Sequence, residues 1–278
     1  MNTERRDGAF AEPRGHGAAP IDNGPVPVRH RLRCDVMDTA AHHRQSPIDI
    51  TRDEVTFGAD LPGLSVRYPN RPVTARVCLE VKDGDPTPAG AEVVPEVVVH
   101  VAGSGAAVVL GGAEYRLDSL HWHTPSEHWI DGRPAPLEVH LVHRSEAGVF
   151  LVIGVLSLVG EHDETIAPAF DLIDRFDPGR LTPDEPQCFD AEVRLDRLLP
   201  KASATFRYDG SLTTAPFTEG VTWIVFTEPL AASADQIDRH MALVSTPTPR
   251  CGDRPNPPGN ARPIQERGRR PIATDLPG

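Results

Sequence analysis

Three histidines of this 278-residue chain have the spacing of a metal site. His121 and His123 stand two residues apart within a strand-like segment, residues 119–123, and side chains at this spacing share one face of a β-strand. His140 lies in a second strand-like segment, residues 137–142. If these segments pair, the three imidazoles converge and leave a fourth coordination position open, as in catalytic rather than structural zinc sites. Zinc held in this way produces hydroxide from water near neutral pH.

Polar residues close to the histidines strengthen this interpretation. Glu138 is two residues before His140, so its carboxylate shares a strand face with that ring and can accept the N–H of a zinc-bound histidine. Ser119 has the same relation to His121, with a shorter side chain. Each histidine alone is explained more simply as a hydrogen-bonded strand residue. The three together, with Glu127, Glu138 and the Thr213–Thr214 pair, favour a metal site.

The remaining histidines need no functional role. His143 falls on the opposite strand face from His140 and is predicted to be a core residue, whereas His128 can pack beside the site. Surface positions are predicted for His16, His30, His42, His43, His162 and His240.

Composition limits the partners and the compartment. The net charge is -12 and no block is dense in lysine or arginine, which argues against nucleic acid and anionic membranes as partners. No apolar run reaches the roughly 18 to 20 residues of a membrane span. No secretory signal is recognisable, so a cytoplasmic location is expected, with a periplasmic or secreted location as the alternative. Monomers or homodimers are expected.

The four cysteines, Cys34, Cys78, Cys188 and Cys251, are widely separated and form no CxxC pair, so a cysteine zinc site is not expected. Four reduced thiols are the favoured interpretation, although the even number leaves disulfides possible.

The elements that must position the histidines are mainly strands. Alternating or apolar segments predict them at residues 64–68, 75–81, 97–101, 106–110, 114–117, 149–159 and 221–226, and the run 149–159 is typical of a central strand buried on both faces. Turns are predicted at 103–105 and 111–112, a turn-rich insertion at 82–90, and short helices at 164–176, 192–199 and 232–244. The fold class is mainly β (α+β): a single domain with a large, mostly antiparallel twisted central sheet and short peripheral helices.

Four separated motifs of this chain resemble the α-class carbonic anhydrases. These are residues 45–50 (QSPIDI), 121–128 (HWHTPSEH), 137–143 (LEVHLVH) and 210–216 (GSLTTAP), with further matches at Trp223 and residues 260–263 (NARP). Their order and spacing agree from about residue 45 to 267. The expected organisation is an irregular or disordered segment at 1–40, a catalytic domain at 41–270 and a tail at 271–278. Carbonic anhydrase is itself the reference example of three-histidine zinc chemistry, so that chemistry comes with the resemblance.

The resemblance implies zinc-dependent, reversible hydration of carbon dioxide to bicarbonate and a proton, through attack of zinc-bound hydroxide. His121, His123 and His140 would bind Zn²⁺, and Glu138 would orient His140. Thr213 would accept a hydrogen bond from the hydroxide and donate its own proton to Glu127, which agrees with the donor capacity of these groups. The other implied residues are Ser119 and Asn260 behind the ligands, Thr214 for bicarbonate, and an apolar wall for carbon dioxide made by Val142, Val152, Leu212, Val221 and Trp223.

The chain departs from the family pattern at several positions. A proton-shuttle histidine is expected near Pro95–Glu96, where none stands, and Glu96 or His100 would be imperfect substitutes. Proton export is therefore expected to limit turnover in weak buffer. Ser119 replaces a glutamine that often pairs with the first zinc histidine, and Phe217 replaces a cysteine that secreted members use for a disulfide.

Two other interpretations fit parts of the pattern. The spacing His121-x-His123-x-x-x-Glu127 resembles the first motif of a metal-dependent cupin, but the glycine-proline-glycine motif expected before the third histidine is missing. A non-catalytic, carbonic-anhydrase-related binding module is the second alternative, although such modules usually lose a zinc histidine and this chain keeps all three.

Overall fold

The computed structural model describes residues 44–58, 60–87, 90–182, 184–201, 204–245 and 259–275, and side chains are not described at 83–93. The expectation for residues 1–40, and those for Cys34 and Cys251, lie outside the described residues.

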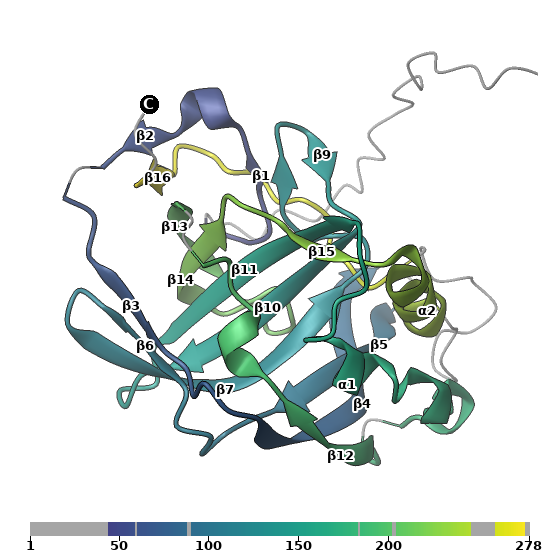
Figure 1. Ribbon diagram of the computed structural model, residues 1–278. Coiled ribbons are helices and arrows are strands. Elements are labelled where there is room, and N and C mark those ends of the chain that lie inside the picture. The colour runs from purple at the N-terminus through teal and green to yellow at the C-terminus, as the bar shows by residue number, and fades with distance from the viewer. Residues whose placement is uncertain are drawn as a thin grey trace, which may run out of the picture. The chain divides into compact units, whose positions relative to one another are not determined.

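A large mixed sheet dominates this part of the chain (Figure 1). Within the described residues it has 13 strands, and its main path runs β12-β4-β5-β7-β10-β11-β14-β13-β16-β2, with β3, β6 and β15 attached. Most neighbours are antiparallel, but β11 pairs parallel with β14 and β15, and β16 with β2. The predicted fold class is confirmed.

The sheet strands have the following bounds: β2 (Thr56–Phe57), β3 (Leu64–Arg67), β4 (Val73–Thr87), β5 (Gly90–His100), β6 (Ala107–Leu110), β7 (Ala113–His123), β10 (Leu137–Arg144), β11 (Phe150–Val159), β12 (Gln187–Val193), β13 (Thr205–Ser211), β14 (Glu219–Phe226), β15 (Leu230–Ala232) and β16 (Ala273–Thr274). A small second sheet contains β1 (Asp49–Ile50), β8 (Trp129–Ile130) and β9 (Arg133–Pro134).

The centre of the sheet is buried on both faces. Strand β11 is rich in β-branched and other apolar residues, and its positions 151–157 are all buried, as the sequence predicted. Alternate residues of the central strands belong to two separate apolar clusters. Ile153 belongs to the larger cluster, together with Trp122 and Leu141. Val152 belongs to the smaller one, together with Trp223.

Helices cover the face of the larger cluster. Phe170 of α1 (Ala167–Phe170) packs against the Trp122 ring, and Ile237 of α2 (Ala234–Val244) lies in the same cluster. Helix α2 begins with a capping box in which Ser233 and Gln236 exchange side-chain-to-backbone hydrogen bonds. The helix predicted at 232–244 is confirmed, and that at 164–176 is reduced to α1 and a 3-10 turn at Ile173–Arg175. No described helix has both the length and the apolar character that a membrane span needs.

Two predicted elements are wrong. Residues 192–199 are not a helix, because β12 continues to Val193 against β4 and only a 3-10 turn at Leu195–Arg197 follows. Residues 82–90 are not a turn-rich insertion, because β4 and β5 extend through most of this range as a long antiparallel hairpin. Pro86 lies in this part of the hairpin, where β4 pairs with β5 alone among the described strands, so the missing backbone donor of proline is tolerated.

The prediction of four reduced cysteines is wrong for two of them. Cys78 and Cys188 form a disulfide between directly opposed positions of β4 and β12, where the two Cα atoms are 4.1 Å apart. Register across a strand pair, and not proximity in sequence, brings these thiols together, since they are 110 residues apart.

His143 and His240 are both core residues, although only His143 was predicted to be one. His143 is fully buried and its Nε2 lies 2.6 Å from the Tyr68 hydroxyl, so its predicted core position is confirmed. His240 was predicted to be exposed, but it is fully buried: it stacks on Phe170 and its Nδ1 lies 2.6 Å from Thr124 Oγ1. The helical periodicity of residues 234–244 places it on the inner face of α2, which the residue type alone did not indicate.

The buried His143 should make the folded state less stable in acid. Burial lowers its pKa from 6.5 to about 4, so between these values the unfolded chain binds the proton more strongly than the folded protein. The stability that this neutral ring contributes is present above about pH 6.5 and is lost as the pH falls toward 4, by up to roughly 3 kcal/mol. Urea unfolding across this range should give a shallower pH profile for His143→Gln. A profile as steep as that of wild type, or an equal flattening in His162→Gln at an exposed site, would contradict the assignment.

Candidate metal centre

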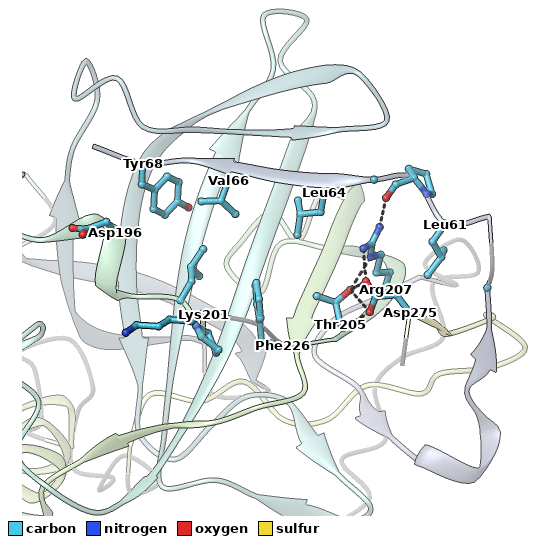
Figure 2. Close-up of a pocket in the computed structure, with 15 residues that line it drawn as sticks. Leu61, Leu64, Val66, Tyr68, Asp196, Lys201, Thr205, Arg207, Phe226 and Asp275 are labelled. Carbon is cyan, nitrogen blue, oxygen red and sulfur yellow. Dashed lines mark hydrogen bonds and ion pairs between the residues drawn. The ribbon is translucent and has the colours of Figure 1, made fainter. Parts of the chain in front are cut away.

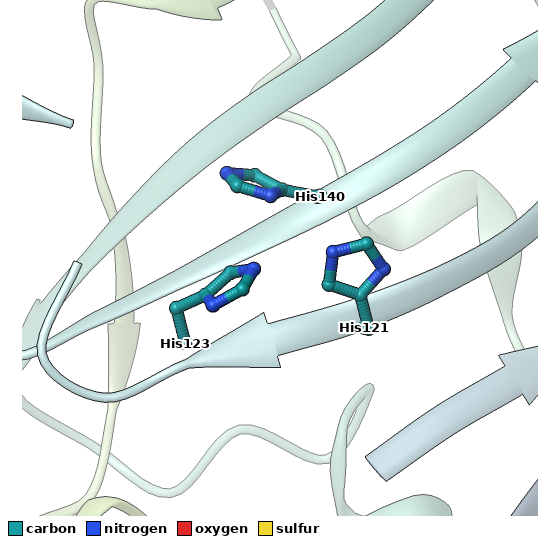
Figure 3. A group of neighbouring side chains, drawn as sticks. All are labelled: His121, His123 and His140. Carbon is teal, nitrogen blue, oxygen red and sulfur yellow. The ribbon is translucent and has the colours of Figure 1, made fainter. Parts of the chain in front are cut away.

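Register between β7 and β10 brings the three predicted histidines together. His121 lies directly opposite His140, and His123 is two residues further along β7 on the same face. One ring nitrogen from each residue lies within 4.8 Å of those of the other two. Figure 3 shows the three rings from the two neighbouring strands directed toward a common space.

The histidine nitrogens are suited to a cation. Nε2 of His121 and Nε2 of His123 are buried and have no hydrogen-bond partner among the described residues. Burial lowers the pKa of His121 to about 4 and that of His123 well below its usual value. Both rings are therefore neutral near pH 7, which is the form that binds metal ions. Buried ring nitrogens without partners, at mutual distances that one ion can bridge, fit a zinc ion.

Glu138 connects His140 to a second buried histidine. Its Oε1 lies 3.0 Å from His140 Nε2 and 2.7 Å from His128 Nδ1, and its Oε2 accepts the His128 backbone N–H at 2.8 Å. Although burial opposes ionisation, His128 and His140 hold the pKa of this carboxyl far below its usual range. His140 Nδ1 lies 3.8 Å from Glu127 Oε2. It is the nitrogen available to a metal ion when Glu138 accepts the Nε2–H.

Gly154 makes room for this carboxylate, and the sequence analysis did not assign it a role. It lies opposite His140 on β11, and a Cβ atom there would come within 2.8 Å of Glu138 Oε1. A glycine within a largely apolar, mostly buried strand was the available signal, because such a glycine often marks a close approach.

Asn260 and Ser119 differ in their relation to the ligands. The Asn260 carbonyl oxygen lies 3.3 Å from His123 Nδ1, and its side chain accepts from the Thr124 N–H and donates to the Trp122 carbonyl. These bonds fasten the C-terminal segment to the end of β7. Ser119 lies on the predicted face, but among the described residues it makes no hydrogen bond to His121.

The structure places Glu127 beside the ligands but does not join it to Thr213. Glu127 is fully buried, accepts the Arg262 backbone N–H at 2.8 Å, and its Oε1 lies 3.4 Å from His123 Nδ1. Thr213 is also buried, in the loop between β13 and β14, and no hydrogen bond joins these two described residues. Oε2 of Glu127 lies 3.8 Å from His140 Nδ1 but accepts no hydrogen bond from the described residues, so it can accept one.

The five residues predicted to form an apolar wall belong to the smaller apolar cluster. Val152, Val221 and Trp223 are buried in it, and Val142 and Leu212 pack against it while partly exposed. Val142, Val152 and Trp223 lie side by side across β10, β11 and β14. The Trp223 ring is 4.8 Å from that of His140, so this apolar surface adjoins the histidines. The predicted bicarbonate residue Thr214 is partly exposed in the same loop as Thr213.

A buried ion pair at the histidines was not predicted. Nζ of Lys82 lies 3.3 Å from Glu96 Oε1 and 3.4 Å from Glu127 Oε1, and the side chains of Lys82 and Glu96 are almost completely buried. Lysine is among the residues least often fully buried without a partner, so its neighbourhood is informative. Because residues 82–90 were predicted to be a turn-rich insertion, a surface position was implied for Lys82 and its burial was not predicted.

A cavity of about 490 Å³ lies elsewhere, between β3 and β13 (Figure 2). None of the three histidines lines it. It is lined by two cationic side chains, Lys201 and Arg207, of which Arg207 is engaged by Asp275 at 2.8 Å and by Thr205. Its other walls include Leu64 and Phe226. The histidine cluster contains buried polar atoms without hydrogen-bond partners, whereas Arg207 of the cavity is already paired. The histidine cluster is therefore the better candidate for chemistry.

Comparison with known proteins agrees with this geometry. The family model for eukaryotic-type carbonic anhydrase matches residues 33–275. A carbonic anhydrase of Pectobacterium carotovorum is 33% identical over 158 residues, covering 57% of this chain and 61% of that protein, so the chain matches less than two thirds of that relative's length. One of Neisseria gonorrhoeae is 32% identical over 223 residues, with 80% of this chain and 77% of the relative covered.

The solved structures give the same result. The α-carbonic anhydrase of Thermovibrio ammonificans, in complex with the inhibitor sulfanilamide, superposes with a TM-score of 0.64 at 28% identity over 83% of this chain and 87% of that one. The cupin interpretation is wrong, because fold and motifs agree with another family over most of the length. A strand pair that brings three buried histidines together, on the fold of these relatives, places this chain in the eukaryotic-type carbonic anhydrase family.

Proposed function

We propose that this protein catalyses the reversible hydration of carbon dioxide to bicarbonate with a zinc ion held by His121, His123 and His140. The convergence of these three buried rings beside an apolar surface carries the proposal. Zinc, when bound, supplies hydroxide from water near neutral pH. Carbon dioxide is apolar and uncharged, so a wall of aliphatic and indole side chains suits it better than a charged clamp.

The chain's own residues would then orient the reactants. Glu138 fixes the ring of His140 and raises its basicity as a ligand. Thr213 accepts a hydrogen bond from the nucleophile and donates its own to the buried Glu127, so a lone pair of the nucleophile points at the substrate. Val152 and Trp223 hold carbon dioxide, and Thr214 contacts bicarbonate as it leaves.

The proposal predicts rapid carbon dioxide hydration that depends on buffer. No histidine stands at Pro95–Glu96, and His100 is engaged by Glu80 at 2.6 Å, so proton export to bulk should rely on buffer molecules. Stopped-flow hydration by zinc-assayed protein should therefore increase with buffer concentration. Turnover that is independent of buffer concentration would refute the claim that a proton shuttle is missing, but not the proposed reaction. Protein that binds one zinc ion and shows no hydration would favour a non-catalytic binding module.

We also propose an oxidising compartment. A disulfide such as Cys78–Cys188 persists mainly outside the reducing cytosol, which favours the periplasmic or secreted alternative over the cytoplasmic expectation. Thiol counting on protein taken directly from the source cells, quenched with acid, tests this: free Cys78 and Cys188 would contradict it.

A further inference from the structure

Glu96 brings a buried carboxylate oxygen to the histidine cluster. Its Oε1 is buried, has no hydrogen-bond partner of good geometry within the described residues, and lies 4.0 Å from His121 Nε2 and 4.0 Å from His123 Nε2. Those two nitrogens are themselves without partners in the same part of the structure. Three buried polar atoms thus face one another, and no hydrogen bond joins the carboxylate oxygen to either ring nitrogen. The cation nearest to this oxygen is Lys82, whose Nζ lies 3.3 Å away.

Strand register explains why Glu96 points at the ligands. Val98 of β5 lies opposite His121 of β7, and Glu96 is two residues before Val98, on the same face. The same register, continued by two residues, places Glu96 level with His123. Its position is therefore set by the sheet, as the positions of the histidines are.

Lys82 compensates the charge of this carboxylate. Glu80 lies opposite Glu96 in the β4–β5 hairpin, and Lys82, two residues after Glu80, reaches Glu96 diagonally across the strands. Although burial itself favours the neutral amine, the carboxylates of Glu127 and Glu96 raise the pKa of Lys82. An ammonium has no lone pair and cannot bind a metal ion, so Glu96 is the member of this pair that can.

The distances bring Glu96 within reach of an ion held by the histidines. Four-coordinate zinc with ligand distances of about 2.1 Å separates neighbouring ligand atoms by about 3.4 Å. The two observed distances of 4.0 Å are longer by only about half an ångström, which side-chain rotation of a glutamate covers.

We infer that Glu96 is a fourth protein ligand of the metal and competes with water for the fourth coordination position. When water takes this position, the Glu96 carboxylate pairs with Lys82 instead. The inference rests on the proposed metal site and adds its regulation. With Glu96 bound, the site has four protein ligands and resembles a closed structural site. With Glu96 on Lys82, the position for the reacting water is free.

Azide binding to the cobalt(II)-substituted protein tests this, since azide must take the open position and alters the visible spectrum of the cobalt. The informative variant is Glu96→Asp, which keeps the charge beside Lys82 but withdraws the carboxylate by about 1.5 Å. If Glu96 occupies the metal in about nine of ten molecules, this variant and Glu96→Gln should both bind azide about tenfold more tightly than wild type. Both should also release zinc to a chelator faster. The matched control is Glu80→Gln, a more exposed carboxylate on the same hairpin, which should leave both readouts unchanged.

The outcomes are distinguishable. If Glu96→Gln binds azide more tightly while Glu96→Asp behaves as wild type, only the charge matters and the inference is overturned. If neither variant differs from wild type, it is overturned as well. Wild-type protein that binds neither cobalt nor zinc would refute the proposed function, and this inference with it.

Discussion

Replacing His140 by alanine should abolish carbon dioxide hydration and tight zinc binding together. His140 is the only predicted ligand on β10, so its loss leaves two nitrogens on one strand. Protein zinc sites bind their metal with about 10 to 16 kcal/mol, and one of three ligands would account for roughly 3 to 5 kcal/mol of this. The zinc dissociation constant should therefore increase by a factor of about 10² to 10⁴. Competition with a chromophoric chelator measures the constant, and stopped-flow hydration measures the rate.

The matched control for this variant is His100→Ala. His100 lies on β5, within the same sheet, but is exposed and paired with Glu80, and it should keep both zinc and activity. Near-UV circular dichroism of both variants separates loss of the ligand from loss of the fold. Zinc affinity in His140→Ala equal to that of wild type would overturn the assignment of the three ligands.

The histidine cluster could be predicted because it depends on local rules. Residues two apart share a strand face, and two strand-like segments only 13 residues apart are natural neighbours in an antiparallel sheet, so His121, His123 and His140 needed only the correct register. The long apolar strand β11 and the capped helix α2 were predictable for the same reason. Hydrophobic periodicity and helix capping depend only on residues that are close together in the sequence.

Features that depend on distant strands were not predictable from the residues. The Cys78–Cys188 disulfide requires knowing that β12 pairs with β4, and segments of such separation carry no mutual signal in one sequence. Lys82 was assigned to a turn-rich insertion at residues 82–90, whereas pairing with β5 keeps that segment extended. Tertiary pairing overrides local turn preference in such cases. Glu96 was considered only as a substitute shuttle, since its approach to His123 depends on three strands at once.

Replacing Thr213 by alanine should leave zinc bound and slow hydration strongly. The hydroxyl is not a predicted ligand, but it is the group proposed to orient the nucleophile, and the buried Glu127 has an oxygen, Oε2, free among the described residues to accept its proton. Loss of one preorganised hydrogen bond that matters in the transition state typically costs about 10² to 10³ in rate. The expected result is a fall of this size in kcat/KM with an unchanged zinc dissociation constant, measured by stopped-flow hydration and chelator competition.

Serine at the same position is the discriminating control. Thr213→Ser keeps the hydroxyl that donates to Glu127 and loses only a methyl group, so it should retain activity within about tenfold of wild type. If serine and alanine slow the reaction equally, the methyl packing of Thr213 matters and the hydroxyl does not. If Thr213→Ala hydrates carbon dioxide at the wild-type rate, the proposal that Thr213 and Glu127 together orient the nucleophile is refuted. Its buried charge would then serve the Arg262 backbone N–H and Lys82, with which the structure pairs it.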